Sequence, residues 1–211
     1  MAAPDDPKSD ELTLTPEQRE HIDGLVEWMQ KTLGINRESR LADNDWMFIV
    51  KLHAMIETGL NDALVKQFNA PELARVIAKL DTSNTATGKV AFSKALQILH
   101  PTSIVFIQKL SELRNFCVHD VRNFGFQLEK YVDGLSEEKR NELVKPVMRV
   151  VAPQFKESTS FREALYIGVM QVMMELQVHD LQCEVRDRKA EGQRLRAELF
   201  DMQQESNPKS E

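Results

Sequence analysis

The chain has 211 residues, and its 33 acidic against 27 basic side chains give a formal net charge of −6. Hydrophobic residues at 42% and charged residues at 28% exclude a disordered or collagen-like chain and are typical of a globular protein with a buried core. The pI near 5.5 argues against broad, sequence-independent DNA binding. Two cysteines, Cys117 and Cys183, are too few for a disulfide framework, so we expect a reducing, cytoplasmic location.

The N-terminal segment is acidic, because six carboxylates against Lys8 and Arg19 place −4 of the net charge in the first 20 residues. We expect a disordered arm over residues 1–14 and no secretory signal, which needs a basic start and an apolar run. A helix begins where Thr15 can cap and Pro16 suits the first turn. Its apolar residues recur at helical spacing before Gly34: Ile22, Leu25, Val26, Met29 and Leu33.

Further helices are predicted through the central part of the chain. The first spans residues 45–68, a short one spans 71–80, and residues 81–88 form a turn-rich loop. Another helix carries Phe92 to Leu99 and ends at Pro101, after which Thr102 or Ser103 caps the next. Residues 121–134 are expected to form a loop followed by a helix. The most apolar short run, residues 46–50, is much shorter than the roughly 20 apolar residues that a membrane helix requires, so no membrane association is expected.

The C-terminal part is predicted to be helical as well. One helix spans residues 136–151 with a kink at Pro146, and Ser160 with Glu163 forms a capping box that starts a long helix. The long helix carries an apolar stripe with the 3–4 spacing of a packed or coiled seam: Leu165, Val169, Val172, Leu176 and Cys183. No strand pattern occurs, so the fold is expected to be an all-α helical bundle. The bundle covers 15–158, the long helix 159–203 is a possible coiled-coil or dimerisation element, and a disordered tail covers 204–211.

One short segment contains residues suited to catalysis: Arg114, Asn115 and His119, with Asp120 after them. Histidine exchanges protons near neutral pH, and arginine presents a forked, permanently charged donor to phosphate oxygens. Together they are sufficient for metal-free cleavage of an RNA phosphodiester, in which a 2′-hydroxyl is deprotonated and negative charge develops on the phosphate. The cysteines and histidines show no metal-ligand spacing, and no phosphate-binding glycine loop is present, so no metal or cofactor is predicted.

The spacing within this segment also leaves a structural alternative open. On a helix, Asn115 and His119 share a face, whereas Arg114 lies about 140° round the axis from His119. Arg114 must therefore curl round the helix, or the two groups act across a subunit interface. In the structural alternative, Arg114 pairs with a carboxylate such as Glu57, and His119 is an ordinary histidine at a helix end.

The segment resembles the Arg-Asn-x-x-x-His motif of the higher eukaryotes and prokaryotes nucleotide-binding (HEPN) superfamily. The helix containing residues 53–64 resembles the acidic helix that packs against the motif in that superfamily. The order of elements over about 45–132 is closest to that of mannitol operon repressor-like proteins. The resemblance implies an all-α bundle in which Arg114 holds the scissile phosphate, His119 is the general acid and base, and Asn115 orients them. Glu57 and Asp120 would be supporting carboxylates, with Glu57 positioning Arg114.

Three functions follow from these features. The first is a metal-independent endoribonuclease of toxin or defence type, acting on RNA as a homodimer. The second is a non-catalytic regulatory module resembling the mannitol operon repressor, which regulates transcription through a partner protein. The third is a helical scaffold that assembles through its C-terminal helix. The local charge over residues 100–130 sums to only +1, so an RNA site would need charges from distant segments or from two subunits.

Several other side chains have two interpretations. Cationic neighbours would lower the pKa of Cys117, whereas a core position would make the thiol inert, and we favour the core position. Met170, Met173 and Met174 are either a binding groove or core, and we favour the core. The charged run 184–194 is expected to be a solvated helix face, with a partner-binding coiled coil as the alternative.

Overall fold

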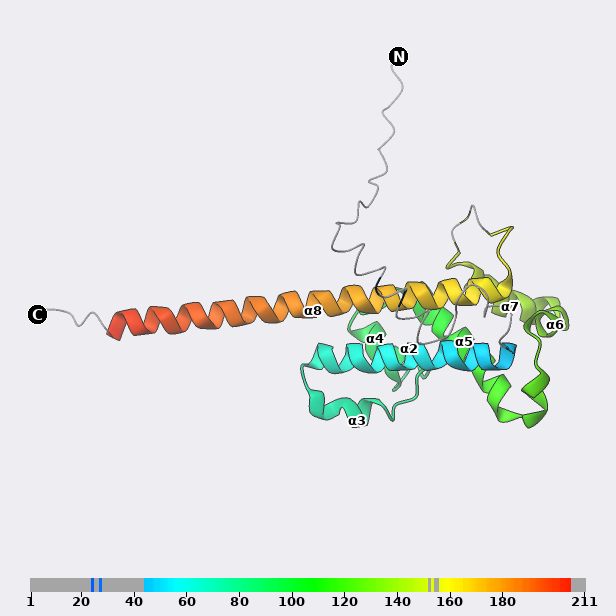
Figure 1. Cartoon of the computed structure of the whole chain (residues 1–211), viewed down its shortest axis with the longest axis horizontal. Coiled ribbons are helices and arrows are strands. Elements are labelled where there is room, and N and C mark those ends of the chain that lie inside the picture. The colour runs from blue at the N-terminus through cyan, green and yellow to red at the C-terminus, as the bar shows by residue number, and fades with distance from the viewer. Residues whose placement is uncertain (1–23, 25–26, 28–43, 152, 154–155, 206–211) are drawn as a thin grey trace, which may run out of the picture. The chain divides into compact units, whose positions relative to one another are not determined.

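The computed structural model describes residues 24, 27, 44–151, 153 and 156–205. The chain divides into two units, 1–43 and 44–211. Gly24 and Glu27 of the first unit are helical, and the rest of the predicted N-terminal arm and helix lies outside the described residues. The second unit contains helices and, over its described residues, no strand, which confirms the all-α bundle with a long C-terminal helix (Figure 1).

The bundle is organised around α2 (Asp45–Phe68), which has the bounds that the sequence predicts. Asn44 caps it by accepting the backbone N–H of Trp46, and Asn69 ends it in the left-handed conformation at φ 48°. The predicted apolar stripe is buried along its whole length: Ile49, Leu52, Ile56, Leu60 and Leu64. One face of α2 therefore lies in the core, and its other face is exposed at Ala54, Thr58 and Asp62.

Between α2 and the motif helix, the predicted short helix is a 3-10 turn, η2 (Pro71–Leu73), followed by α3 (Ala74–Ile77). The loop 81–88 leads into α4 (Lys89–Ala95). Then α5 (Pro101–His119) begins with Pro101 at its first position, and His100 Nδ1 accepts the N–H of Thr102. The predicted cap at Thr102 or Ser103 is wrong, because the hydroxyl of Ser103 donates instead to Glu175 Oε1 at 2.6 Å.

The rest of the bundle follows the predicted order. The segment after α5 consists of η3 (Val121–Gly125) and α6 (Leu128–Asp133), as the predicted loop plus helix suggested. Ser136 caps α7 (Glu137–Met148), which contains Pro146. The capping box is confirmed at the start of α8 (Phe161–Glu205), where Ser160 N–H donates to Glu163 and Glu163 N–H donates to Ser160 Oγ. None of the described helices is long and apolar enough to cross a membrane.

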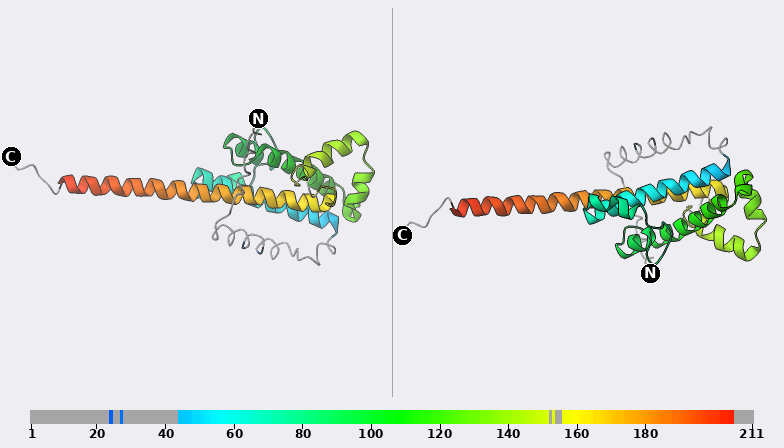
Figure 2. Two further views of the ribbon diagram at one scale, coloured as in Figure 1. Left: turned by 90° about the horizontal axis from the view of Figure 1, so that it is seen from above. Right: turned by 90° about the horizontal axis from the view of Figure 1, so that it is seen from below.

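The helices α2 and α8 run parallel and in contact, as the two views of Figure 2 and the ion pairs at both ends show. Asp45 binds Arg162 at one end, and Lys66 Nζ binds Glu184 Oε1 at 2.8 Å at the other. The predicted stripe of α8, from Leu165 to Cys183, is buried against the bundle. The core therefore consists of facing stripes on α2, α5 and α8, with α7 packed against α5 and α8.

Gly168 allows α8 to approach α5 closely, because a Cβ at this position would lie 2.2 Å from the ring of Phe106. We expect Gly168→Ala to lower the free energy of unfolding by about 1–3 kcal/mol, since the buried ring has to move. Urea unfolding followed by circular dichroism measures this change. Gly192→Ala in the same helix is the control, because a Cβ there meets nothing within 4 Å and should leave stability equal or higher. Equal losses in both variants would contradict the prediction.

Candidate functional site

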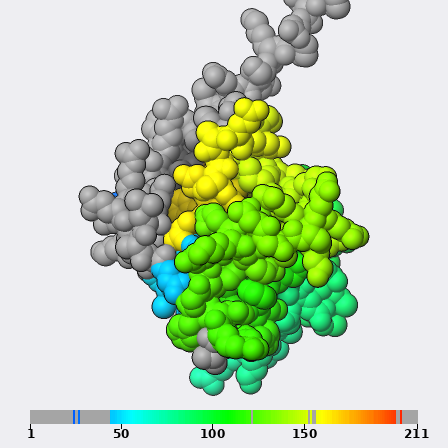
Figure 3. Space-filling model, turned by 90° about the vertical axis from the view of Figure 1, so that its right-hand side faces the viewer, coloured from blue at the N-terminus to red at the C-terminus, as the bar shows by residue number. Residues whose placement is uncertain are grey.

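The Arg-Asn-x-x-x-His segment occupies the last two turns of α5, at the end of the bundle where α2 begins. The carbonyls in a final helical turn have no partner within the helix. Here Asn123 Nδ2 donates to Phe116 O at 2.7 Å, and Trp46 Nε1 donates to Cys117 O at 2.8 Å. Figure 3 views this end of the bundle, where the green segment that follows α5 lies beside the blue start of α2. These two bonds anchor the motif turn to α2 and to η3.

The side chain of Arg114 bends toward Asn115. Its Nη1 donates to Asn115 Oδ1 at 3.0 Å, and Asn115 and His119 are both exposed. Asn115 and His119 are four residues apart and therefore share a face of the helix. The hydrogen bond thus draws the guanidinium from its own side of α5 toward the face that carries the imidazole.

The two supporting carboxylates have partners other than the motif. Asp120 ends α5 and caps η3, because its Oδ1 accepts the backbone N–H of Arg122 at 2.9 Å. It also pairs with the Arg122 guanidinium at 2.7 Å, and the side-chain hydrogen bonds from Arg122 are the main reason why the pKa of Asp120 lies below its ordinary value. Glu57 Oε1 accepts a hydrogen bond from Lys89 Nζ at 2.8 Å rather than from Arg114. Neither carboxylate orients His119 in the described contacts.

A buried polar cluster lies on the inner side of the motif, where α2, α4 and α5 meet. His53 Nε2 and Ser111 Oγ are 3.1 Å apart, and His53 Nδ1 lies 4.0 Å from Glu57 Oε2. The Lys89 side chain in this cluster is 0% exposed. His53 and Lys89 were not among the site residues predicted from the sequence. The spacing of four residues between His53 and Glu57 could have indicated that their side chains lie close together. No feature of the sequence indicates that Lys89, next to a turn-rich loop, is buried.

The His53 side chain links this cluster to stability at acidic pH. Burial, and after it the positive charge of Arg114, lower the pKa of His53 below 6.5. The unfolded chain therefore takes up this proton first, and the free energy of unfolding should fall as the pH drops below about 6.5 toward the folded-state value. Urea unfolding of wild type and His53→Gln between pH 7 and 5 tests this, and the variant should have the shallower slope. The pKa of His179 is also lowered, so the difference between the two proteins isolates His53. Parallel slopes would contradict the prediction.

Cys117 lies within the motif, but its thiol is buried. Burial raises its pKa to about 11, so Cys117 is an inert core residue and not an activated thiolate. Cys183 is buried on α8, and burial raises the pKa of its thiol too. Both cysteines therefore fill core positions.

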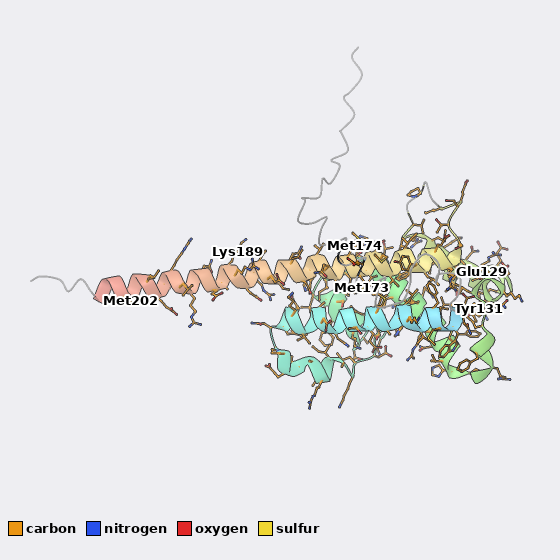
Figure 4. The ribbon with its side chains drawn as sticks, viewed as in Figure 1. Glu129, Tyr131, Met173, Met174, Lys189 and Met202 are labelled. Carbon is orange, nitrogen blue, oxygen red and sulfur yellow. The ribbon has the colours of Figure 1, made fainter. Side chains whose placement is uncertain are left out.

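Exposed aromatic rings surround the motif turn. Phe124 in η3 is 58% exposed and stacks on Trp46 with ring centroids 4.8 Å apart. Phe116 is exposed on α5, and its ring centroid lies 4.6 Å from that of Tyr131 in α6. Figure 4 labels Tyr131. The Arg122 side chain, which follows the motif in η3, is 90% exposed and pairs with Asp120. Such rings next to cations can stack unpaired bases and bind the backbone between them.

The chemical capacity of this surface therefore comes from an imidazole, a guanidinium, an amide and aromatic faces. In the described part of the chain, no three His, Cys, Asp or Glu side chains are placed to bind a metal ion. No family model, no curated protein and no solved structure matches the chain.

Proposed function

We propose that the protein is a metal-independent endoribonuclease whose site is the last two turns of α5. The observation that carries the proposal is the hydrogen bond from Arg114 to Asn115, which draws the guanidinium toward the exposed face of His119. A phosphate bound by Arg114 would then lie on the side of the helix from which His119 projects. The resemblance to the HEPN superfamily is part of the same proposal.

The reaction requires only the groups on this surface. His119 accepts the proton of the ribose 2′-hydroxyl, and the 2′-oxygen attacks the phosphorus as the bond to the 5′-oxygen breaks. The proton passes to the departing 5′-oxygen, which leaves a 2′,3′-cyclic phosphate and a 5′-hydroxyl end. Arg114 stabilises the charge that develops on the phosphate, and Asn115 holds the guanidinium in place. The exposed rings of Phe116 and Phe124 favour a single-stranded substrate, because only unpaired bases can stack on them.

The proposal is tested by incubating the purified protein with labelled single-stranded RNA in excess EDTA. Cleavage with 2′,3′-cyclic phosphate ends is expected, and a matched DNA oligonucleotide should stay intact because it has no 2′-hydroxyl. Equal cutting of DNA, or RNA products with 3′-hydroxyl ends, would contradict the assigned chemistry.

A specific observation favours a second candidate, a non-catalytic regulatory module. Glu57 is bound to Lys89 and Asp120 to Arg122, so both carboxylates expected to support the motif are engaged elsewhere. This candidate predicts no RNA cleavage but a stable complex with a partner protein on co-purification. The cleavage assay therefore separates the two functions.

A further inference from the structure

The helix α8 carries a second apolar stripe on a different face from the stripe that is buried in the core. Positions 174 and 176 lie about 160° apart round a helix, and Met174 is exposed where Leu176 is buried. Of the three methionines predicted to be core, only Met173 is buried, so the prediction is wrong for Met174. The exposed stripe continues from Met174 at alternating steps of four and three residues. Its apolar members are 39% to 56% exposed: Met174, Val178, Leu181, Val185, Leu195, Leu199 and Met202.

The stripe extends past the end of the bundle. Arg186 Nη1 still contacts Gln67 of α2, whereas every side chain from Asp187 to Leu199 is exposed. Figure 4 shows Lys189 and Met202 on the part of α8 that runs beyond α2. A helix gains most of its stability by packing an apolar face, whereas the segment from Asp187 to Leu199 packs on no other described element. At the near end, Met174 and Val178 line a groove of about 1330 Å³ between α8 and the α4–α5 corner, so the apolar surface is continuous.

The spacing is that of a coiled coil. Steps of four and three residues put Val178, Val185 and Leu199 at one seam position of the heptad, and Leu181 and Leu195 at the other. Two positions of the seam, Arg188 and Gly192, are not apolar. A shift by one heptad would bury Arg188 against a leucine of the other helix. In register, the two Arg188 side chains share one polar layer, which fixes the register at a cost in stability.

The charges beside the seam select the partner and its direction. From residue 184 onward the positions before the first seam residue are acidic, Glu184, Glu191 and Glu198, and those after the second are basic, Lys189 and Arg196, whereas the corresponding positions nearer the bundle are Gln177, Glu175 and Gln182. In a parallel pair of identical helices, Glu191 faces Arg196 of the other copy, five residues further on. Glu184 has the same spacing to Lys189 but already pairs with Lys66 of α2. In an antiparallel pair, acids face acids and bases face bases. The helix is therefore complementary to itself in one orientation.

We propose that α8 binds α8 of a second copy of this chain, parallel and in register, over residues 174–202. The inference does not depend on the proposed chemistry at α5. It places two bundles side by side at one end of a two-stranded coiled coil. Because Arg188 and Gly192 interrupt the seam, the dimer dissociates more readily than one with a fully apolar seam.

The test is the mass of the full-length protein by sedimentation equilibrium over about 1–100 µM, a range that covers moderate dimer affinities. A dimer is expected, and the double variant Leu195→Glu/Leu199→Glu should raise its dissociation constant by at least about 100-fold. The matched control is Ala190→Glu/Ala197→Glu, which adds the same charges on the outer face of the same helix and should leave the mass unchanged. The mass of a monomer at all concentrations would overturn the proposal. An equal rise of the dissociation constant in both double variants would overturn it as well.

Orientation is tested by charge reversal in the same measurement. Glu191→Lys should weaken a parallel dimer about 5-fold by facing Arg196, and adding Arg196→Glu should restore the affinity. In an antiparallel dimer, Glu191→Lys would strengthen association instead, which would refute the parallel arrangement. RNA cleavage by wild type is scored separately, so failure of the dimer and failure of the nuclease give different results.

Discussion

Replacing His119 by alanine is expected to lower the rate of RNA cleavage by about 10²–10⁴-fold, the usual contribution of a general acid–base group. The imidazole lies exposed at the last residue of α5, so its removal should change the stability of the bundle little. The rate is measured with labelled single-stranded RNA in EDTA under single-turnover conditions. Circular dichroism and thermal unfolding of the same preparation establish that the variant is folded.

His100→Ala is the matched control for this prediction. His100 caps the opposite end of the same helix through Thr102, so the variant loses a cap and a histidine but leaves the motif intact. It should cleave at close to the wild-type rate. Cleavage that survives in His119→Ala would refute the role of this imidazole, as would an equal loss in His100→Ala, which would indicate a general effect on the helix.

The second large effect is expected at the buried ion pair below the motif. Glu57→Ala should lower the free energy of unfolding by about 2–4 kcal/mol, because it leaves the ammonium of Lys89 buried without its counterion. This range is below the value for a fully buried pair, because Glu57 is 38% exposed and water can partly replace it. Urea unfolding at pH 7 measures the loss.

Adding Lys89→Met to Glu57→Ala should recover much of the lost stability, since the second change removes the buried charge itself. Lys89→Met alone should cost less than Glu57→Ala, because the exposed side of Glu57 remains hydrated. If the double variant is less stable than Glu57→Ala, the loss comes from packing rather than from the unpaired charge. Additive losses would likewise contradict the electrostatic explanation.

Several features of the fold could be predicted from residues close together in the chain. The bounds of α2 and the capping box of Ser160 and Glu163 follow from helical spacing and terminal hydrogen bonds, which involve neighbouring residues. The cap of α5 was predicted wrongly because the helix begins at Pro101, so that Ser103 lies inside it and donates to Glu175, a residue 72 positions away. A local signal could not show that this hydroxyl is already engaged.

The candidate site divides in the same way. Arg114, Asn115 and His119 are neighbours in sequence, so their residue types and spacing were visible there, and the bend of Arg114 toward Asn115 is a contact between adjacent residues. The partner of Glu57 could not be predicted. It depends on how the loop 81–88 turns Lys89 inward, with Lys89 N–H donating to Asp81 O at 2.9 Å.

The sequence by itself determined that the chain is helical, where α2, α7 and α8 begin and end to within a few residues, and which residues form the motif, because helix periodicity and capping act over about one turn. The helix predicted to reach Leu99 ends at Ala95. The sequence also contained both apolar stripes of α8. Only the tertiary structure decided that the stripe from Leu165 to Cys183 packs on α2 while the stripe from Met174 to Met202 stays exposed. Both stripes have the spacing of a packed seam, and which of them is buried depends on where α2 and α5 lie, a matter of packing between segments distant in the chain.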